Sequence, residues 1–361
     1  MGYATASRPM AAPVSWANEV SRMNHSRAIF GCAGPHLSAD EAAFFRETRP
    51  WGFILFARNV ETPDQVRGLV GALRETIGDA TAPVLIDQEG GRVARLKPPH
   101  WHERPPAARF GDLHLVNPDA AREAAYLNAR LIAHDLSELG INVDCLPVLD
   151  VPVPGAHDVI GDRAFAHDPL TVIALGRAQI EGLMEGGVLP VMKHIPGHGR
   201  ASSDSHRQLP KVATPLAELS ASDFVPFRSL SMCPMAMAAH VVYESIDPQR
   251  PATVSPKVVR KVIRGEIGFD GLLMSDDLSM QALSGGLGER TKAALFAGCD
   301  VVLHCNGKMD EMKQVAKEAK RLEGDALKRA DQACAHAAKA DASFEPMAAE
   351  ARVTQLLAEA A

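Results

Sequence analysis

The densest group of reactive side chains in the sequence lies in residues 193–210, KHIPGHGRASSDSHRQLP. A proline and two glycines follow the Lys-His pair and predict a turn, so the polar residues after them should form a loop. Asp204 and His206 stand two residues apart in this loop. A carboxylate beside an imidazole can fix its tautomer and raise its pKa, which suits a general acid–base at neutral pH. Asp-x-His pairs are also common by chance, so this interpretation needs support from the rest of the site.

The same segment offers ligands for a metal ion. His194, His198, Asp204 and His206 would be enough for zinc. Their spacing does not follow the i, i+4 repeat of two ligands on one helix, and the sequence has no HExxH motif. We therefore expect no metal and no cofactor, and a metal-dependent hydrolase remains an alternative.

Two further segments combine carboxylates with strand-like sequence. In residues 269–280, FDGLLMSDDLSM, either Asp276 or Asp277 could attack an anomeric carbon, or both could cap the next helix. Strand alternation does not decide between them. In residues 86–96, IDQEGGRVARL, Asp87 could accept hydrogen bonds from vicinal sugar hydroxyls, and Arg95 could orient it or contact the ligand.

The elements that would position these residues are short apolar runs separated by amphipathic, helical stretches. The runs are continuous rather than alternating, as in parallel strands that are covered on both faces. They lie at 27–34, 52–57, 83–88, 141–150, 188–194, 235–242, 271–276 and 300–305. This succession predicts a single-domain (β/α)8 TIM-type barrel, and no GxGxxG motif supports a dinucleotide-binding fold. The proline-rich stretch 97–118 predicts a long loop over one end of the barrel.

In such a barrel, reactive groups lie at the carboxyl ends of the strands. Charged or polar residues end run after run in this sequence, which predicts a polar pocket at that end because buried charges must be paired or used. The residues concerned are Asp87, Asp150, Lys193, His194, His240, Asp276 and His304.

Composition excludes several classes of protein. The chain has 361 residues, 46% of them hydrophobic and 23% charged, with a net charge of −6, which argues against a disordered chain, a collagen or a coiled coil. The weak acidity gives no general attraction to nucleic acid or anionic lipid. The six cysteines form no CxxC pair, and no apolar run reaches the length of a membrane span. We expect a cytoplasmic protein with a loosely ordered leader (1–26), a catalytic barrel (27–310) and a helical tail packed on it (311–361).

Seven stretches, in family order between about residues 27 and 310, resemble glycoside hydrolase family 3, and specifically its single-domain bacterial β-N-acetylglucosaminidases of peptidoglycan recycling. They are GFILFARN, IDQEGGRVARL, LPVLDV, KHIPGHGRASSDSH, AHVVY, GFDGLLMSDDLSM and AGCDVVLHCN.

The resemblance implies a role for each matching position. Asp276 would be the catalytic nucleophile, His206 the general acid/base and Asp204 its polarising partner. Substrate-binding positions would be Asp87, Arg95, Arg163, Lys193 and His194. Beside Arg163, Ala164 replaces the serine expected from the family, so this loop departs from the family pattern.

These roles imply a two-step retaining hydrolysis that releases terminal GlcNAc from GlcNAc-β-1,4-anhydroMurNAc or its peptides. With 5% aromatic residues and three tryptophans, the sequence favours a small pocket that holds one terminal sugar over a long stacking groove. We expect a monomer that acts on a small muropeptide or GlcNAc-containing disaccharide. The alternatives are a family 3 β-glucosidase, a phosphorylase that uses phosphate as acceptor, and a non-catalytic sugar-binding barrel.

Overall fold

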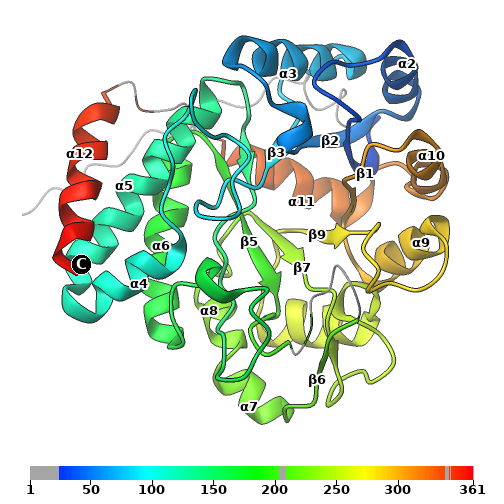
Figure 1. The fold of residues 1–361 in the computed structure, drawn as a ribbon. Helices are drawn as coiled ribbons and strands as arrows, with labels where there is room; N and C mark the ends of the chain where they lie inside the picture. The colour runs from blue at the N-terminus through cyan, green and yellow to red at the C-terminus, as the bar shows by residue number, and fades with distance from the viewer. Residues whose placement is uncertain (1–23, 202, 204–208, 338–340, 342, 361) are drawn as a thin grey trace, which may run out of the picture.

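The computed structural model describes residues 24–201, 203, 209–337, 341 and 343–360. Within them, eight parallel strands close into a barrel in the order β1-β10-β9-β7-β5-β4-β3-β2, with helices around it (Figure 1). The strands are β1 (Ser26–Gly31), β2 (Pro50–Leu55), β3 (Val84–Ile86), β4 (Val143–Asp144), β5 (Leu189–Ile195), β7 (Met235–Ala238), β9 (Leu272–Asp277) and β10 (Val301–His304). Each overlaps one predicted run, so the predicted (β/α)8 barrel is confirmed.

The helices around the barrel differ widely in length. The longer ones are α2 (Ala39–Thr48), α3 (Pro63–Ile77), α4 (Ala107–Val116), α5 (Pro118–Ser137), α6 (Pro169–Glu185), α9 (Leu287–Ala297), α10 (Met309–Glu318), α11 (Gly324–Ala335) and α12 (Pro346–Leu357), with the π-helix η4 (Val258–Glu266). Shorter elements are α7 (Leu216–Ala221), α8 (Phe224–Ser229), η1 (Ala57–Asn59), η2 (Gly161–Arg163), η3 (Ala252–Val254), η5 (Ala358–Ala360) and the paired strands β6 (Lys211–Val212) and β8 (Val242–Tyr243). None of the described helices is long and apolar enough to span a membrane.

Each barrel strand is apolar on both sides because it separates two cores. In β10, Val301 and Leu303 belong to the cluster inside the barrel, whereas Val302 belongs to the layer between barrel and helices. The alternation follows from the two-residue period of a strand. The interior is therefore filled with side chains, as in other TIM barrels, and ligands can bind only at its ends.

Helix α11 closes the amino-terminal end of the barrel. Ala326, Ala330 and Ala333 pack into the interior cluster, and Arg329 pairs with Asp300, the residue before β10, at 3.3 Å. The opposite, carboxyl end remains accessible, and it carries the long connections after β3, β4 and β5.

The prediction of a loop throughout residues 97–118 is wrong in its second half. No proline lies between Pro106 and Pro118, and α4 occupies this interval, beginning directly after Pro106. Phe110 and Leu113, three residues apart, are both buried, and this helical spacing lets α4 pack on α5. Arg104, just before α4, pairs with Asp135 of α5 at 2.9 Å and also with α12.

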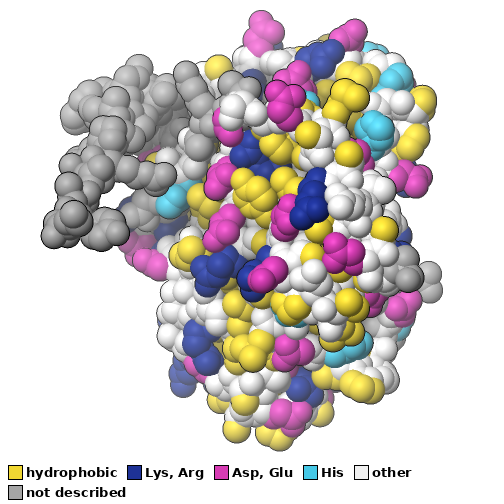
Figure 2. Space-filling view, turned by 90° about the vertical axis from the view of Figure 1, so that its left-hand side faces the viewer, with side chains coloured by type: hydrophobic (Ala, Val, Ile, Leu, Met, Phe, Trp, Pro, Cys, Tyr) yellow, Lys and Arg dark blue, Asp and Glu magenta, His cyan; other side chains and the backbone are white. Residues whose placement is uncertain are grey.

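Helix α12 lies on the outside of α5, at the left of Figure 1. On the face seen in Figure 2, acidic and basic side chains are interspersed with apolar ones rather than separated by sign.

Candidate active site

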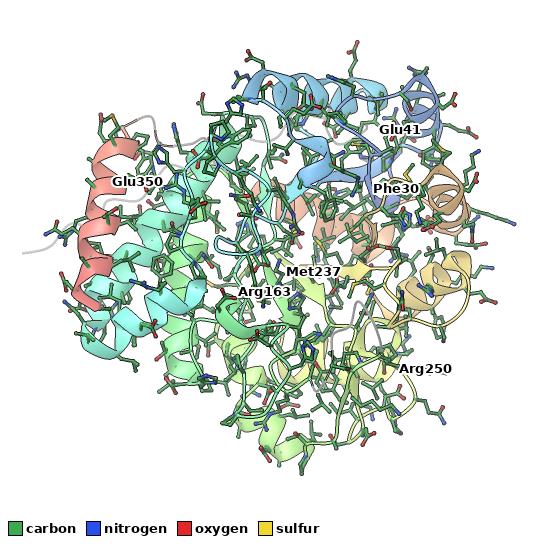
Figure 3. All side chains as sticks on the ribbon, viewed as in Figure 1. Phe30, Glu41, Arg163, Met237, Arg250 and Glu350 are labelled. Atoms are coloured by element: carbon green, nitrogen blue, oxygen red, sulfur yellow. The ribbon has the colours of Figure 1, made fainter. Side chains whose placement is uncertain are left out.

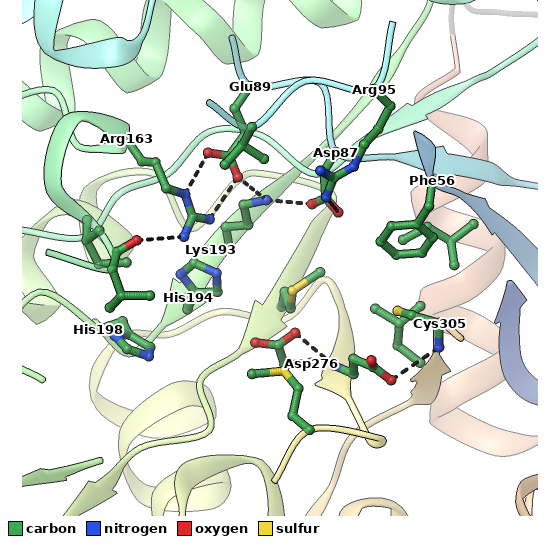
Figure 4. Close-up of a pocket in the computed structure, with 18 residues that line it drawn as sticks. Phe56, Asp87, Glu89, Arg95, Arg163, Lys193, His194, His198, Asp276 and Cys305 are labelled. Carbon is green, nitrogen blue, oxygen red and sulfur yellow. Dashed lines mark hydrogen bonds and ion pairs between the residues drawn. The ribbon is translucent and has the colours of Figure 1, made fainter. Parts of the chain in front are cut away.

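A hollow of about 760 Å³, including its open mouth, lies at the carboxyl end of the barrel (Figure 4). Its walls come from the segments that follow β2, β3, β4, β5, β9 and β10. The lining residues are Ile54, Phe56, Asp87, Glu89, Val93, Arg95, Val159, Ile160, Arg163, Lys193, His194, His198, Met237, Asp276, Asp277, Met280, Leu303 and Cys305. The structure thus brings together six predicted site residues: Asp87, Arg95, Arg163, Lys193, His194 and Asp276.

Asp87 follows β3 and forms ion pairs with two cations. Its Oδ1 accepts a hydrogen bond from Lys193 Nζ at 2.8 Å, and its Oδ2 accepts one from Arg95 Nη2 at 3.3 Å. Burial by itself would raise the pKa of Asp87, but the charges of Lys193 and Arg95 outweigh burial and hold that pKa below its ordinary value. Asp87 is therefore an ionised hydrogen-bond acceptor between Lys193 and Arg95.

Glu89 is a carboxylate of the hollow that pairs with two cations and was not among the predicted site residues. Its Oε1 lies 2.7 Å from Lys193 Nζ, and the Arg163 guanidinium donates to both of its oxygens at 2.8 Å. Burial would raise the pKa of Glu89, but these two cations lower it. Its position in the sequence could have indicated this role. Residues i and i+2 of an extended segment point to the same side, so Glu89 should face the same way as Asp87.

Lys193, near the end of β5, joins the two carboxylates. Its side chain is 2% exposed, and burial would lower its pKa, yet Asp87 and Glu89 together raise that pKa above the ordinary value. An ammonium group has three N–H donors. Two of them point to Asp87 and Glu89, which leaves one for a ligand hydroxyl.

Asp150, after β4, contacts two histidines that line the hollow. Its Oδ2 lies 2.7 Å from His194 Nδ1, and its Oδ1 accepts the backbone N–H of His198 at 2.7 Å. Burial opposes ionisation of Asp150, but its contacts with His194 and His198 outweigh burial and lower the pKa of Asp150 to about 2. The His194 proton therefore resides on Nδ1, and Nε2 is left for other contacts.

His198 is a buried imidazole whose ring centre lies 5.6 Å from that of His194. Burial, reinforced by the nearby His194, lowers the pKa of His198 to about 4. His198 is thus a neutral group in the wall of the hollow at physiological pH.

The two consecutive carboxylates at the end of β9 have different surroundings. Asp277 accepts hydrogen bonds from the backbone N–H of Ser279 at 3.0 Å and of Cys305 at 3.2 Å, and from the Ser279 hydroxyl at 2.5 Å. Asp276 accepts the Asp277 N–H at 2.7 Å and lies across the hollow from Lys193 and Glu89 (Figure 4). Asp277 thus ties the end of β9 to the segment after β10, whereas Asp276 lies opposite the wall that carries Lys193 and Glu89.

His240 lies behind these carboxylates and holds the strand end in place. Its Nε2 is 3.0 Å from the Asp277 carbonyl oxygen, and its Nδ1 is 2.7 Å from the Thr253 hydroxyl. Burial lowers the pKa of His240, and the ring links the Asp277 carbonyl to the Thr253 hydroxyl, which itself donates to the Ala239 carbonyl at 2.9 Å.

His304 ends β10 at the carboxyl end of the barrel, as expected, but its side chain does not line the hollow. Leu303 and Cys305 line the hollow, so strand alternation turns His304 outward, with its ring edge against Phe30. Its Nε2 lies 3.7 Å from Glu311 of α10.

Asp204 and His206, the predicted acid/base pair, lie outside the described residues. Two of the four candidate zinc ligands therefore cannot be placed. In the part of the chain that the structure describes, no group of three or more His, Cys, Asp and Glu side chains could hold a metal ion.

The geometry suits recognition of a small polyhydroxylated ligand. One wall presents two ionised acceptors interleaved with Lys193, Arg95 and Arg163, so adjacent hydroxyls can both donate and accept there. Asp276 faces that wall from the other side, within the same hollow.

Comparisons with known proteins agree on one family. Residues 28–339 match the Glycosyl hydrolase family 3 N terminal domain. The chain is similar to a "Beta-hexosaminidase" of Methylococcus capsulatus, at 40% identity over 282 residues that cover 77% of this chain and 82% of that protein. It is similar to a "Beta-hexosaminidase" of Pseudomonas aeruginosa at 40% identity over 276 residues, covering 76% and 80%.

The fold is also similar to that of NagZ from Neisseria gonorrhoeae, solved in complex with N-trifluoroacetyl-D-glucosamine. That comparison gives a TM-score of 0.84 and 31% identity, and covers 93% of this chain and 99% of the other. A family 3 β-N-acetylglucosaminidase from Paenibacillus matches with a TM-score of 0.80 and 28% identity over 95% of this chain and 68% of that one.

Proposed function

The chain belongs to glycosyl hydrolase family 3 as a β-hexosaminidase, and we propose that it is an exo-acting, retaining β-N-acetylglucosaminidase that releases terminal GlcNAc from GlcNAc-β-1,4-anhydroMurNAc and its peptides. The observation that carries the proposal is the polar wall of Asp87, Glu89, Lys193 and Arg163 opposite Asp276. Such a wall can hold the hydroxyls of one sugar while its anomeric carbon faces the carboxylate.

In the first step, the Asp276 carboxylate attacks the anomeric carbon and the bond from that carbon to the glycosidic oxygen breaks. His206, oriented by Asp204, gives its proton to the departing oxygen. In the second step, His206 removes a proton from water, the water oxygen bonds to the anomeric carbon, and Asp276 is released as a carboxylate. Two inversions at the same carbon retain its configuration.

The shape of the hollow supports removal of one terminal sugar. Ile54, Met237 and Leu303 line its inner end and belong to the filled interior of the barrel. A glycan chain therefore cannot pass through, and only its end can enter.

The deciding experiment compares hydrolysis of an aryl N-acetyl-β-glucosaminide with that of an aryl β-glucoside. We expect strong preference for the first, retention of the β configuration, the same rate with chelator, and free GlcNAc rather than its 1-phosphate when phosphate is added. Preference for the glucoside, inhibition by chelator, or formation of the sugar phosphate would each favour the corresponding alternative.

The proposed substrate also defines where the enzyme would work. A small muropeptide or GlcNAc-containing disaccharide is a soluble fragment, and we propose that a monomeric enzyme meets it in the cytoplasm. Light scattering of the purified protein and fractionation of the host cell test these two points.

A further inference from the structure

The segment between β4 and α6 supplies part of the hollow but has little regular structure of its own. It contributes Val159, Ile160 and Arg163 to the lining, and η2 is its single helical turn. Such a segment keeps a fixed shape only if neighbouring segments hold its backbone. The contacts that hold this backbone therefore determine the position of Arg163.

Arg92, from the segment after β3, is the main attachment on the outer side. Its Nε donates to Asp162 Oδ1 at 2.8 Å. Its Nη2 lies 2.9 Å from the carbonyl oxygens of Asp158 and Val159 and 3.1 Å from that of Ile160. One guanidinium group thus contacts three consecutive carbonyls and a carboxylate of the same loop.

Three carbonyl oxygens that converge on one point repel one another unless a donor lies between them. The turn is tight at Gly161, whose φ of +45° lies in the left-handed region, and its hypothetical Cβ would lie 2.3 Å from the Asp158 carboxylate. The guanidinium meets this turn with two nitrogens, Nη2 among the carbonyl oxygens and Nε at Asp162, whereas a lysine ammonium offers a single nitrogen. Arg92 therefore stabilises the turn that brings Arg163 to the hollow.

The same backbone oxygen links Arg92 to the site. Arg163 Nη1 donates to the Val159 carbonyl at 3.2 Å. This oxygen therefore accepts hydrogen bonds from Arg92 on the outer side of the loop and from Arg163 on the side of the hollow. On its other side, Arg163 pairs with Glu89 through two hydrogen bonds. Arg163 is thus held between a carboxylate and a carbonyl, and Arg92 fixes that carbonyl.

We propose that Arg92 is a positioning residue for substrate binding: it holds residues 158–162 in the conformation that directs Arg163 into the hollow. This inference rests on the proposed function, because it assigns Arg163 a contact with the substrate. Arg92 itself lies on the outer side of the loop, away from the reacting atoms.

The test measures kcat and KM on an aryl N-acetyl-β-glucosaminide for four single variants. Arg92→Ala should raise KM about tenfold and change kcat by less than about threefold, as for one lost hydrogen bond of a charged group that acts in binding. Arg92→Lys should recover only part of the loss. Asp162→Ala should change KM by less than about twofold, because a half-exposed ion pair contributes little and the carbonyl contacts remain.

Arg67→Ala is the matched control. The Arg67 side chain is 46% exposed, the same as Arg92, and it pairs with Asp64 on the surface of α3. This variant should behave as wild type. An unchanged KM in Arg92→Ala, or an equal rise in Arg67→Ala, would overturn the proposal.

A double-mutant cycle shows whether Arg92 acts through Arg163. In an Arg163→Ala background, adding Arg92→Ala should raise KM by less than about twofold more, since coupled residues are not additive. Fully additive effects would overturn the proposed route.

Hydrogen exchange gives a readout that needs no activity. The amides of Arg163 and Ala164 bond to the carbonyls of Ile160 and Gly161, and they should exchange faster in Arg92→Ala than in Arg67→Ala. Unchanged exchange would refute the positioning role. If wild type fails to cleave the aryl substrate, the proposed function is wrong, whereas this exchange difference still tests how Arg92 holds the loop.

Discussion

Replacing Glu89 by glutamine should weaken substrate binding while leaving the barrel folded. Glutamine has nearly the same shape, but it offers one acceptor oxygen where the carboxylate offers two. Placed at the Oε1 position, this oxygen keeps the contacts with Lys193 at 2.7 Å and Arg163 Nη2 at 2.8 Å. The amide NH2 then faces Arg163 Nε–H, so two donors meet where a 2.8 Å hydrogen bond existed.

The magnitude follows from that lost bond. A hydrogen bond that involves a charged group contributes about 1.5–3 kcal/mol. If Arg163 turns away to relieve the clash, that amount is lost from ligand binding, and KM should rise about 10- to 100-fold at 1.4 kcal/mol per factor of ten. Asp276 lies across the hollow from Glu89 (Figure 4), and kcat should change by less than about threefold, as for an interaction that acts in binding alone.

Glu41→Gln is the control for burying an amide in place of a carboxylate. Glu41 is also buried, but its oxygens accept from the backbone N–H of Ala33 and from Ser38, all neutral donors. Figure 3 shows it at α2, far from Arg163 in the view. We expect a loss of stability in this variant with kcat and KM unchanged. A wild-type KM in Glu89→Gln, or equal kinetic damage in both variants, would refute the reasoning.

Unfolding experiments at several pH values provide an independent check. Because the cations lower the pKa of folded Glu89 below its ordinary 4.5, the ionised group stabilises the folded state above about pH 4.5 and loses this contribution as pH falls further. The difference in unfolding free energy between wild type and Glu89→Gln should be constant from pH 8 to 5 and shrink below 4.5.

Three other predictions test the proposed mechanism. Asp276→Ala should lower kcat on the order of 10³-fold or more with an unchanged unfolding midpoint, and near-normal turnover would exclude it as the nucleophile. His206→Ala should slow hydrolysis of natural disaccharides more than that of aryl glycosides with good leaving groups, because only the former need a proton on the departing oxygen, and equal damage to both would contradict the acid role. His198→Gln should remove part of the loss of stability that wild type shows on acidification. The pKa of folded His198 is about 4 against an ordinary 6.5, so the unfolded chain binds more protons between these values, and stability falls by up to about 3 kcal/mol as pH drops through that window. A variant with the same pH dependence as wild type, measured by denaturant unfolding at pH 7, 5.5 and 4.5, would contradict the assignment.

The barrel could be predicted from the sequence because continuous apolar runs separated by helical patterns have few other solutions. Given a barrel, the rule that strand ends carry the site also selected Asp87, Lys193 and Asp276 before any contact was known. The same rule failed for His304, because it ignores which side of the strand the last residue faces.

Other features depend on contacts between distant segments. Glu89 is important because β5 and the loop after β4 bring Lys193 and Arg163 to it, 104 and 74 positions away in the sequence respectively. The different surroundings of Asp276 and Asp277 depend on Cys305 of the neighbouring connection. No local pattern encodes these partners.

The charges of the polar wall explain why its groups should not set the pH dependence of catalysis. Cations lower the pKa values of Asp87 and Glu89, and these carboxylates in turn raise the pKa values of Lys193 and Arg163. All four groups therefore keep their charges through the neutral range, and the wall binds hydroxyls in the same way at pH 6 and pH 8. A group that changes protonation in that range must then account for any change in turnover. In the proposed mechanism that group is His206, so its pKa should appear in the rate profile of the wild type and be absent from that of His206→Ala.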